Sequence, residues 1–286
     1  MNQLADSMIL LTHNELEQIA TAIEQKQPEI QLSTSLGRWA PKRARINGCL
    51  IQIDGELFDF SRVTYDQKSV YRLENGSLKK IQFFSEETNK LYKLVPTAPL
   101  PTLAISGVYM HRLADGGPKA DNLRRMRRLQ PLKNRLVLDT CLGLGYTAIE
   151  AAKACKAVYA FERDVNVIEI ARINPYSWEM FHSNNIHITI GDIYEEIENL
   201  EDAFFNRILH DPPTFSLAGE LYSRRFYEQL YRVLRPKGIL LHYTGAPGSK
   251  KRGRDLPAEV MKRLNDVGFR NVARAPEVLG VVARRF

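Results

Sequence analysis

The sequence contains no apolar run that approaches the length needed to span a membrane. Its N-terminus also lacks a basic region followed by the apolar core of a signal sequence, because the apolar stretch from Met8 to Leu11 is too short. These absences argue against a membrane-spanning or secreted protein. We therefore expect a cytoplasmic protein with no membrane partner.

Cysteine is also scarce, and Cys49, Cys141 and Cys155 show no paired spacing. This scatter argues against a disulfide framework and a structural zinc site, so we predict no metal. No internal repeat or low-complexity tract is present. With 286 residues, of which 44% are hydrophobic, the chain can build one large domain or two modest ones.

The first third of the chain predicts a small α+β domain over residues 1–95. Thr12 and Glu15 have the spacing of a capping box, which opens a helix that Pro28 ends. From about residue 46 the apolar period changes to two, and the pair Asn75-Gly76 signals a hairpin. We expect this domain to serve substrate recognition, because it carries no catalytic signature.

Residues 96–134 are predicted to connect this domain to a catalytic domain over residues 135–286. The connection begins with a proline-rich linker at 96–101 and ends with a basic helix at 121–129. Beyond it, predicted strands alternate with helices, and the clearest helix spans 221–234. The predicted strands lie near 135–139, 157–161, 186–190, 206–210 and 238–243, followed by two short strands, 269–273 and 278–283, that should pair antiparallel.

The segment from Arg135 to Ala148 reads as a buried strand, a tight glycine turn and the start of a helix. Gly143 and Gly145 would let the backbone approach a ligand, and the helix would direct N–H groups toward it. Asp139 ends the strand. This arrangement predicts a site for a nucleotide-type cofactor.

Two classes of cofactor could bind at this turn, namely dinucleotides and cofactors that contain a methionine moiety. Residues 143–148 formally match the dinucleotide fingerprint. However, the Asp139 carboxylate suits the ammonium of a methionine moiety and would repel a pyrophosphate. Glu162 ends the second strand and can accept both ribose hydroxyls of either cofactor. Asp211-Pro212-Pro213 ends the fourth strand, where it suits amine methylation, although the two prolines could also form only a rigid turn.

These features resemble the class I S-adenosylmethionine-dependent methyltransferases over roughly residues 105–286. The segments 139–148 and 210–222 are similar to a group of predicted methyltransferases best represented in archaea. The resemblance implies S-adenosylmethionine as cofactor. It also implies a doubly wound, Rossmann-like α/β sheet whose parallel strands are closed by an antiparallel C-terminal hairpin, with the small α+β domain added at the N-terminus.

The strand ends can be assigned to parts of this cofactor. Asp139, Gly143 and Gly145 would hold the methionine end, and Glu162 would hold the ribose. Asp192 follows the third strand and could accept from the adenine amine. An aspartate at that position could instead cap the next helix.

In enzymes that methylate an exocyclic or amide nitrogen, a similar Asp/Asn-Pro-Pro-aromatic motif accepts hydrogen bonds from the target amine. The resemblance assigns this role to Asp211 and to a carbonyl fixed by Pro212. The sequence departs from the motif because Thr214 follows the prolines and the aromatic residue is Phe215. Stacking of a planar base on Phe215, and hence base methylation, is left open.

Three further residues could act on a substrate. His210 and His242 end neighbouring strands, and a neutral imidazole suits deprotonation near pH 7. Tyr222 is another candidate base. Each histidine could equally have a structural role. We assign Asp211, Pro212, His210 and Tyr222 to catalysis, and Phe215 and His242 to substrate binding.

The formal net charge of +7 favours RNA as the methyl acceptor over a small metabolite. The alternatives are a methyltransferase or an aminopropyltransferase for small metabolites, a non-catalytic binding module and a nicotinamide oxidoreductase. The oligomeric state is not predicted.

Three clusters carry the basic charge: Arg38, Lys42, Arg43 and Arg45; Lys119, Arg124, Arg125, Arg127, Arg128, Lys133 and Arg135; and Lys250, Lys251, Arg252 and Arg254.

Overall fold

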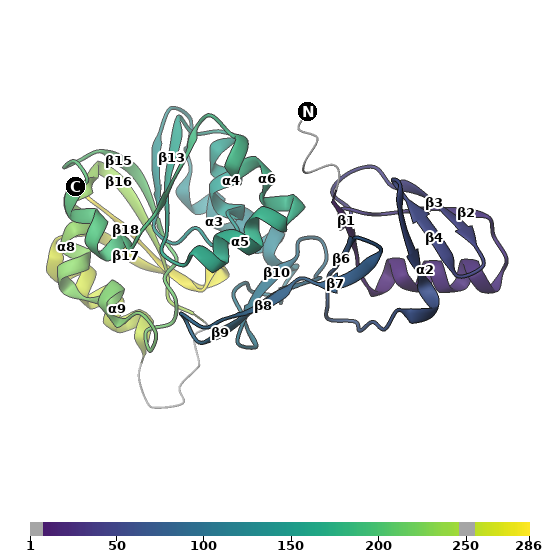
Figure 1. The fold of residues 1–286 in the computed structure, drawn as a ribbon. Coiled ribbons are helices and arrows are strands. Elements are labelled where there is room, and N and C mark those ends of the chain that lie inside the picture. The colour runs from purple at the N-terminus through teal and green to yellow at the C-terminus, as the bar shows by residue number, and fades with distance from the viewer. Residues whose placement is uncertain (1–7, 246–254) are drawn as a thin grey trace. The chain divides into compact units, whose positions relative to one another are not determined.

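The computed structural model describes residues 8–245 and 255–286, and the chain folds into two compact units (Figure 1). The N-terminal unit comprises Met1–Pro118 and Glu169–Trp178, and the C-terminal unit comprises Lys119–Ile168 and Glu179–Phe286. The third basic cluster of the sequence, at 250–254, lies outside the described residues, as does part of the loop that follows His242.

The N-terminal unit begins with the capping box that its sequence predicts. Thr12 Oγ1 accepts from the Asn14 amide at 3.2 Å, and Glu15 Oε2 accepts from the Thr12 amide at 2.9 Å. These two bonds satisfy amide groups that a helix start leaves without partners. Helix α2 (His13–Glu24) follows and buries Leu16 and Ile19.

Three small antiparallel sheets complete this unit. The strands of these sheets span only a few residues each, and short turns connect them. Gly48, at a φ of +59°, makes one such turn inside a stretch that the alternation alone presents as a single strand. The sheets are β1 (Ile9–Leu11), β6 (Tyr71–Glu74) and β7 (Ser77–Lys80); β2 (Glu29–Leu32), β3 (Lys42–Asn47), β4 (Leu50–Ile53) and β5 (Glu56–Asp59); and β8 (Gln82–Ser85), β9 (Lys90–Val95), β10 (Thr102–Ile105) and β11 (Val108–Tyr109).

The proline-rich segment 96–101 lies inside a strand pair. Strands β9 and β10 pair antiparallel, with Val95 opposite Thr102, so the segment is the loop that joins them. The sequence predicts a stiff linker between domains there, but proline stiffness alone does not distinguish a linker from a rigid hairpin loop. The predicted domain ranges therefore stay a proposal.

The C-terminal unit contains one seven-stranded sheet in the order β14-β13-β12-β15-β16-β18-β17. The first five strands in this order are parallel, and β18 pairs antiparallel with both β16 and β17. This is the predicted parallel sheet closed by an antiparallel hairpin. The strands are β12 (Leu136–Asp139), β13 (Ala157–Glu162), β14 (Ile186–Ile190), β15 (Phe205–His210), β16 (Leu234–Tyr243), β17 (Arg270–Ala275) and β18 (Gly280–Arg284).

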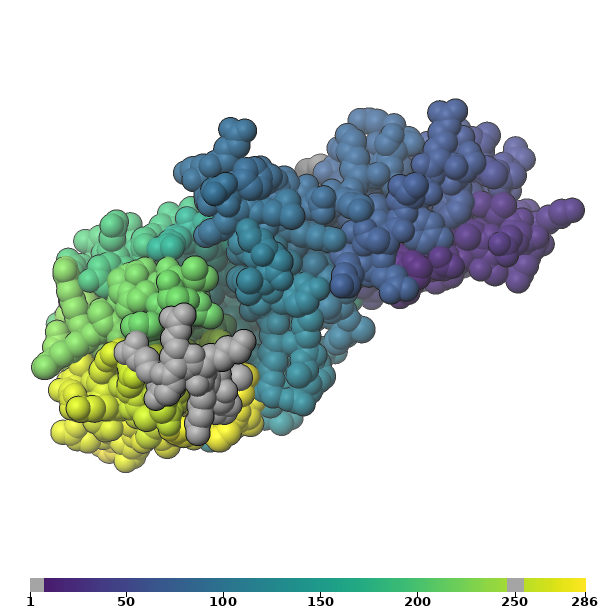
Figure 2. All heavy atoms as spheres, turned by 90° about the horizontal axis from the view of Figure 1, so that it is seen from below, coloured from purple at the N-terminus to yellow at the C-terminus, as the bar shows by residue number. Residues whose placement is uncertain are grey.

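Helices cover both faces of this sheet. Figure 1 shows α8 and α9 on one side and α4 on the other. Figure 2 shows the C-terminal segments in yellow packed against the green segments that precede them, as the contacts of α9 with α8, β17 and β18 require. The helices are α3 (Gly117–Leu129), α4 (Tyr146–Ala152), α5 (Val165–Ile173), α6 (Trp178–His182), α7 (Ile193–Glu196), α8 (Arg224–Val233) and α9 (Leu256–Val267).

Strand alternation decides which side chains belong to each face. Leu138, Ile208 and Leu240 lie side by side in the register and join the core under α8 and α9. Residues one position along each strand point to the opposite face. Asp139 therefore points away from the α8 core, whereas His210 points into it.

Candidate active site

The predicted site residues lie at the carboxyl ends of parallel strands. Strands β12 and β15 are hydrogen-bonded neighbours, so Asp139 and Asp211 follow at the same edge of the sheet. Ligand sites of open α/β sheets form at this edge. Glu162 ends the neighbouring strand β13, and Asp192 follows β14.

The two glycines of the turn have different reasons to be glycine. Gly143 has a φ of +57°, and no atom lies within 4 Å of the position that a Cβ would occupy, so a ligand can approach its backbone. A Cβ on Gly145 would lie 2.1 Å from Met180 Sδ of α6. The prediction that both glycines admit a ligand is thus supported by space only at Gly143, because helix packing requires Gly145.

Asp139 is 1% exposed. Its Oδ2 accepts from Thr147 Oγ1 at 2.7 Å. Burial raises the pKa of the Asp139 carboxyl to about 7, and the nearby charge of Asp211 acts in the same direction. A cation at this carboxyl would favour its ionised form. Asp139 also bonds Thr147 in the first turn of α4 and, at 3.4 Å, the Cys141 amide, so it helps to hold the start of this helix.

Glu162 ties β13 to the glycine turn. Its Oε2 accepts from the Gly143 amide at 2.9 Å, and its Oε1 accepts from the Asp164 amide at 3.0 Å. Burial raises the pKa of this carboxyl, and both amide bonds oppose the rise. An ionised carboxylate has about four acceptor positions, so hydroxyl donors could still bind.

Asp192 caps the helix that follows it. Its Oδ1 accepts from the Tyr194 amide at 2.9 Å, and its Oδ2 pairs with Arg163 at 3.1 Å. The cap that the sequence left open is therefore present. Both oxygens are engaged, and the predicted contact with adenine stays a prediction.

Asp211 is held by an arginine that sequence reasoning did not assign to the site. Arg125 of α3 donates through Nη1 to Asp211 Oδ2 and through Nε to Asp121 Oδ2, the latter at 2.8 Å. The Arg125 side chain is 9% exposed, and its guanidinium lies 4.9 Å from the Tyr243 ring centroid. Burial raises the pKa of Asp211, whereas the charge of Arg125 lowers it.

Tyr222 holds the turn that follows Asp211. The Tyr222 hydroxyl donates to the Pro213 carbonyl at 2.9 Å, and the half-buried Phe215 ring meets the Tyr222 ring edge to face, with centroids 5.4 Å apart. Burial raises the pKa of Tyr222. This geometry favours a supporting role for Tyr222 over the predicted base, and the Phe215 ring packs against Tyr222.

His210 and His242 lie in the α8 core, where both nitrogens of each ring have protein partners. His210 Nε2 lies 3.0 Å from the Leu221 carbonyl, so it must be the donor, and Nδ1 then accepts from Thr140 Oγ1 at 2.8 Å. His242 contacts the Tyr243 carbonyl at 2.7 Å and the Tyr227 hydroxyl at 2.9 Å. Burial lowers the pKa of His210 to about 3. The geometry favours structural roles, because neither ring has a nitrogen left for a substrate.

The sequence carries one signal of the buried face of α3. Asp121, Arg125 and Leu129 repeat at intervals of four residues and share one helix face, and Leu129 is completely buried. The i,i+4 pairing of Asp121 with Arg125 instead suggests a solvated ion pair, which is the commoner case.

Many of the basic residues offered for RNA binding pair with acids of this chain. The pairs within the described residues include Lys42–Asp54, Arg43–Glu29, Arg124–Asp121, Arg125–Asp121, Arg125–Asp211 and Arg128–Glu277. These pairs reduce the positive surface that the first two clusters predict.

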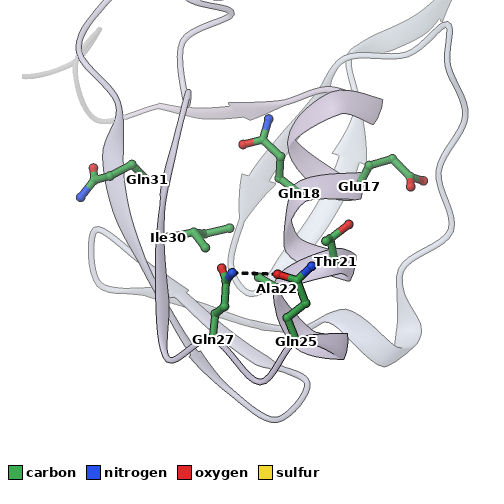
Figure 3. A pocket seen from close by; sticks show the side chains of 8 residues that line it. All are labelled: Glu17, Gln18, Thr21, Ala22, Gln25, Gln27, Ile30 and Gln31. Atoms are coloured by element: carbon green, nitrogen blue, oxygen red, sulfur yellow. Dashed lines mark hydrogen bonds between the residues drawn. The ribbon is translucent and has the colours of Figure 1, made fainter.

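Other kinds of site are not evident in the described part of the chain. No helix there is long and apolar enough to cross a membrane, and no group of three metal-ligating side chains gathers there. The N-terminal unit has a shallow pocket of about 430 Å³ beside α2 and β2 (Figure 3). Half of its lining residues are glutamines, and the pocket contains none of the predicted site residues.

Comparison with known proteins gives the class. Residues 101–244 match the family described as "Methyltransferase small domain", and the chain belongs to this family of S-adenosylmethionine-dependent enzymes. Over 222 residues it is 47% identical to an uncharacterized protein of Methanocaldococcus jannaschii, covering 78% of this chain and 75% of that protein.

Two further similarities concern transferases for polyamines. The chain is 29% identical over 132 residues to a polyamine aminopropyltransferase of Prochlorococcus marinus, covering 44% of this chain and 45% of that protein. Its fold is similar to that of spermidine synthase from Thermotoga maritima, with a TM-score of 0.54 and 19% identity over 73% of this chain and 75% of that chain. At that identity the likeness concerns the fold alone.

The predicted class, fold and cofactor are therefore confirmed. The turn fits S-adenosylmethionine, because a buried carboxylate, an open glycine and a second acid stand at one sheet edge. The residues that would hold it are Asp139, Gly143 and Glu162.

Proposed function

We propose that this chain methylates a nitrogen whose N–H group is accepted by Asp211. The observation that carries the proposal is the fixed Asp211 carboxylate at the end of β15, beside the strand that ends in Asp139. Bound S-adenosylmethionine supplies an electrophilic methyl group. The protein then has chiefly to place the acceptor nitrogen in line with it.

Asp211 would perform this placement. Its Oδ2 is occupied by Arg125, whereas among the described residues its Oδ1 accepts no hydrogen bond. Oδ1 and the backbone next to Pro212 would accept the two N–H groups of an amine, which leaves the nitrogen lone pair directed at the methyl. Tyr222 supports this turn through the Pro213 carbonyl.

The test is methyl transfer from labelled S-adenosylmethionine to pools of RNA and of small nitrogenous metabolites. We expect labelled product with the wild-type protein. Asp211→Ala should lower the rate by about two to three orders of magnitude, comparable to the loss of one fixed hydrogen bond in a transition state. Binding of S-adenosylhomocysteine should persist in the variant, and its loss would mean that the variant is damaged more widely.

RNA is the acceptor we propose, supported by the net charge of +7. Lys119 and Arg127 on α3 would contribute phosphate contacts. Affinity for RNA should fall steeply between 50 and 200 mM salt, by about tenfold or more for a few phosphate contacts. Methyl transfer only to small acceptors, independent of salt, would favour the metabolite alternative.

Aminopropyl transfer is the second candidate, favoured by the similarity to polyamine aminopropyltransferases. Calorimetry with S-adenosylmethionine and its decarboxylated form separates the two. The methyltransferase proposal expects tighter binding of the intact cofactor. Tighter binding of the decarboxylated form would support the alternative.

A further inference from the structure

We infer that Arg125 determines acceptor specificity, by positioning the Asp211 carboxylate and reserving the site for neutral nitrogens while excluding alkylammonium ions. The inference rests on the proposed role of Asp211. It adds a residue of α3 to a site otherwise built from strand ends. It also separates the chain from enzymes whose acceptors are polyamines.

Three contacts fix the Arg125 guanidinium. Nη1 bonds Asp211 Oδ2, Nε bonds Asp121 Oδ2 at 2.8 Å, and the group lies over the Tyr243 ring at 4.9 Å. Asp121 is only 5% exposed and also lies 3.7 Å from Arg124. If Arg125 turned away, the partly buried Asp211 carboxylate would lose its ion pair and the buried Asp121 would lose one of its two arginines, which is costly.

The charge balance follows from these contacts. Asp211 interacts electrostatically with Arg125, Asp121, Asp139, Cys141 and Tyr222, and among these groups Arg125 is the cation. A second cation at Asp211 would meet the fixed guanidinium at close range in a weakly screened environment. An aliphatic amine is protonated at neutral pH, since its pKa is about 10. It would therefore have to lose a proton before it could bind or react.

A neutral amine or amide meets no such penalty. Its N–H group needs only an acceptor, and Asp211 Oδ1 is free of partners among the described residues. Arg125 holds the other oxygen and so sets the direction of Oδ1. Net stability does not explain the buried pair, because apolar residues of similar volume usually stabilise a fold as well or better.

The experiment compares Arg125→Gln with the wild-type full-length chain, without cofactor. Carbon-13 NMR of the Asp211 carboxyl should show its pKa raised by about 1 to 3 in the variant, because the opposite charge is lost. Calorimetry with 1,4-diaminobutane should show binding at least tenfold tighter in Arg125→Gln than in wild type. The control is Arg128→Gln, because Arg128 lies on the same helix as Arg125 and forms an exposed pair with Glu277. This variant should change neither value.

Arg125→Lys provides the second variant if Arg125→Gln does not fold. It retains the charge but loses the second hydrogen bond, so the pKa of Asp211 should stay near the wild-type value while KM for a neutral acceptor rises. An unchanged Asp211 pKa in Arg125→Gln, or strong diamine binding by the wild-type protein, would overturn the inference. If both predicted shifts occur but no nitrogen acceptor is methylated, the proposed function fails and the electrostatic role of Arg125 stands.

Discussion

Neighbouring residues at one sheet edge have opposite environments, and the alternation of side chains along β15 is the reason. His210 points into the α8 core and is completely buried, whereas Asp211, one residue later, meets Arg125 of α3. A position at a strand end is therefore insufficient to assign a catalytic role. The face on which the side chain emerges decides what it can reach.

Asp139 gives a prediction at this scale. Because burial raises its pKa to about 7, the carboxyl is neutral below that pH and ionised above it. The ammonium of S-adenosylmethionine favours the ionised form, so cofactor affinity should increase as the pH rises from 6 to 8, with release of a proton on binding. Calorimetry in buffers of different ionisation enthalpy measures both effects. Asp139→Asn should bind the cofactor weakly and without this pH dependence. A wild-type cofactor affinity that does not change with pH would contradict the assignment.

The two turn glycines give a second prediction. Gly145→Ala should destabilise the protein by about 2–4 kcal/mol, since it combines a left-handed backbone with overpacking against Met180. Gly143→Ala should cost only the backbone term, about 1–2 kcal/mol, yet weaken cofactor binding. Urea unfolding and calorimetry measure the two effects. Gly145→Ala made in a Met180→Ala background is the control, and an equal loss of stability in both backgrounds would exclude the clash as the cause.

At the scale of elements, His210 of β15 and His242 of β16 are buried beside α8 and carry no charge. The folded-state pKa of His210 is lowered to about 3, below the 6.5 of an exposed histidine. The unfolded chain therefore takes up a proton between these values, and this contribution to stability is present above pH 6.5 and lost as the pH falls toward 3. His210→Gln should reduce the loss of unfolding free energy between pH 7.5 and 4.5.

The same variant separates the structural role from the catalytic one. Glutamine can donate to the Leu221 carbonyl and accept from Thr140, so methyl transfer should stay within about threefold of wild type, as expected for a group that supplies no proton transfer. A loss of a hundredfold or more with the fold intact would restore the general-base prediction.

Whether an element could be predicted depends on how distinct a sequence pattern its structure requires. Strands β12, β13 and β15 could be predicted because buried parallel strands require continuous apolar runs. The short strands of the N-terminal unit could not be separated, because a two-residue turn such as that at Gly48 scarcely interrupts the alternation. At the site, Asp139 and Glu162 could be found from their place after such strands, but Arg125 depends on how α3 packs on the sheet, which local sequence does not specify.

At the scale of the whole molecule, cofactor binding should stabilise the C-terminal unit. A ligand at 100 times its Kd adds about 2.7 kcal/mol to the free energy of unfolding. For a unit of this size, that corresponds to a rise in Tm of about 5–11 °C. Calorimetric scans should show this rise with S-adenosylmethionine and S-adenosylhomocysteine and none with NAD. A rise with NAD alone would contradict the cofactor assignment.

The most direct measurement is the position of the transferred methyl group. Protein incubated with methyl-deuterated S-adenosylmethionine and cellular RNA should yield a deuterated methyl group on a nitrogen, located by mass spectrometry of the digested product. Asp211→Ala should slow the labelling by about two to three orders of magnitude while cofactor binding persists. A label on oxygen or carbon, or an undiminished label in Asp211→Ala, would contradict the role proposed for Asp211.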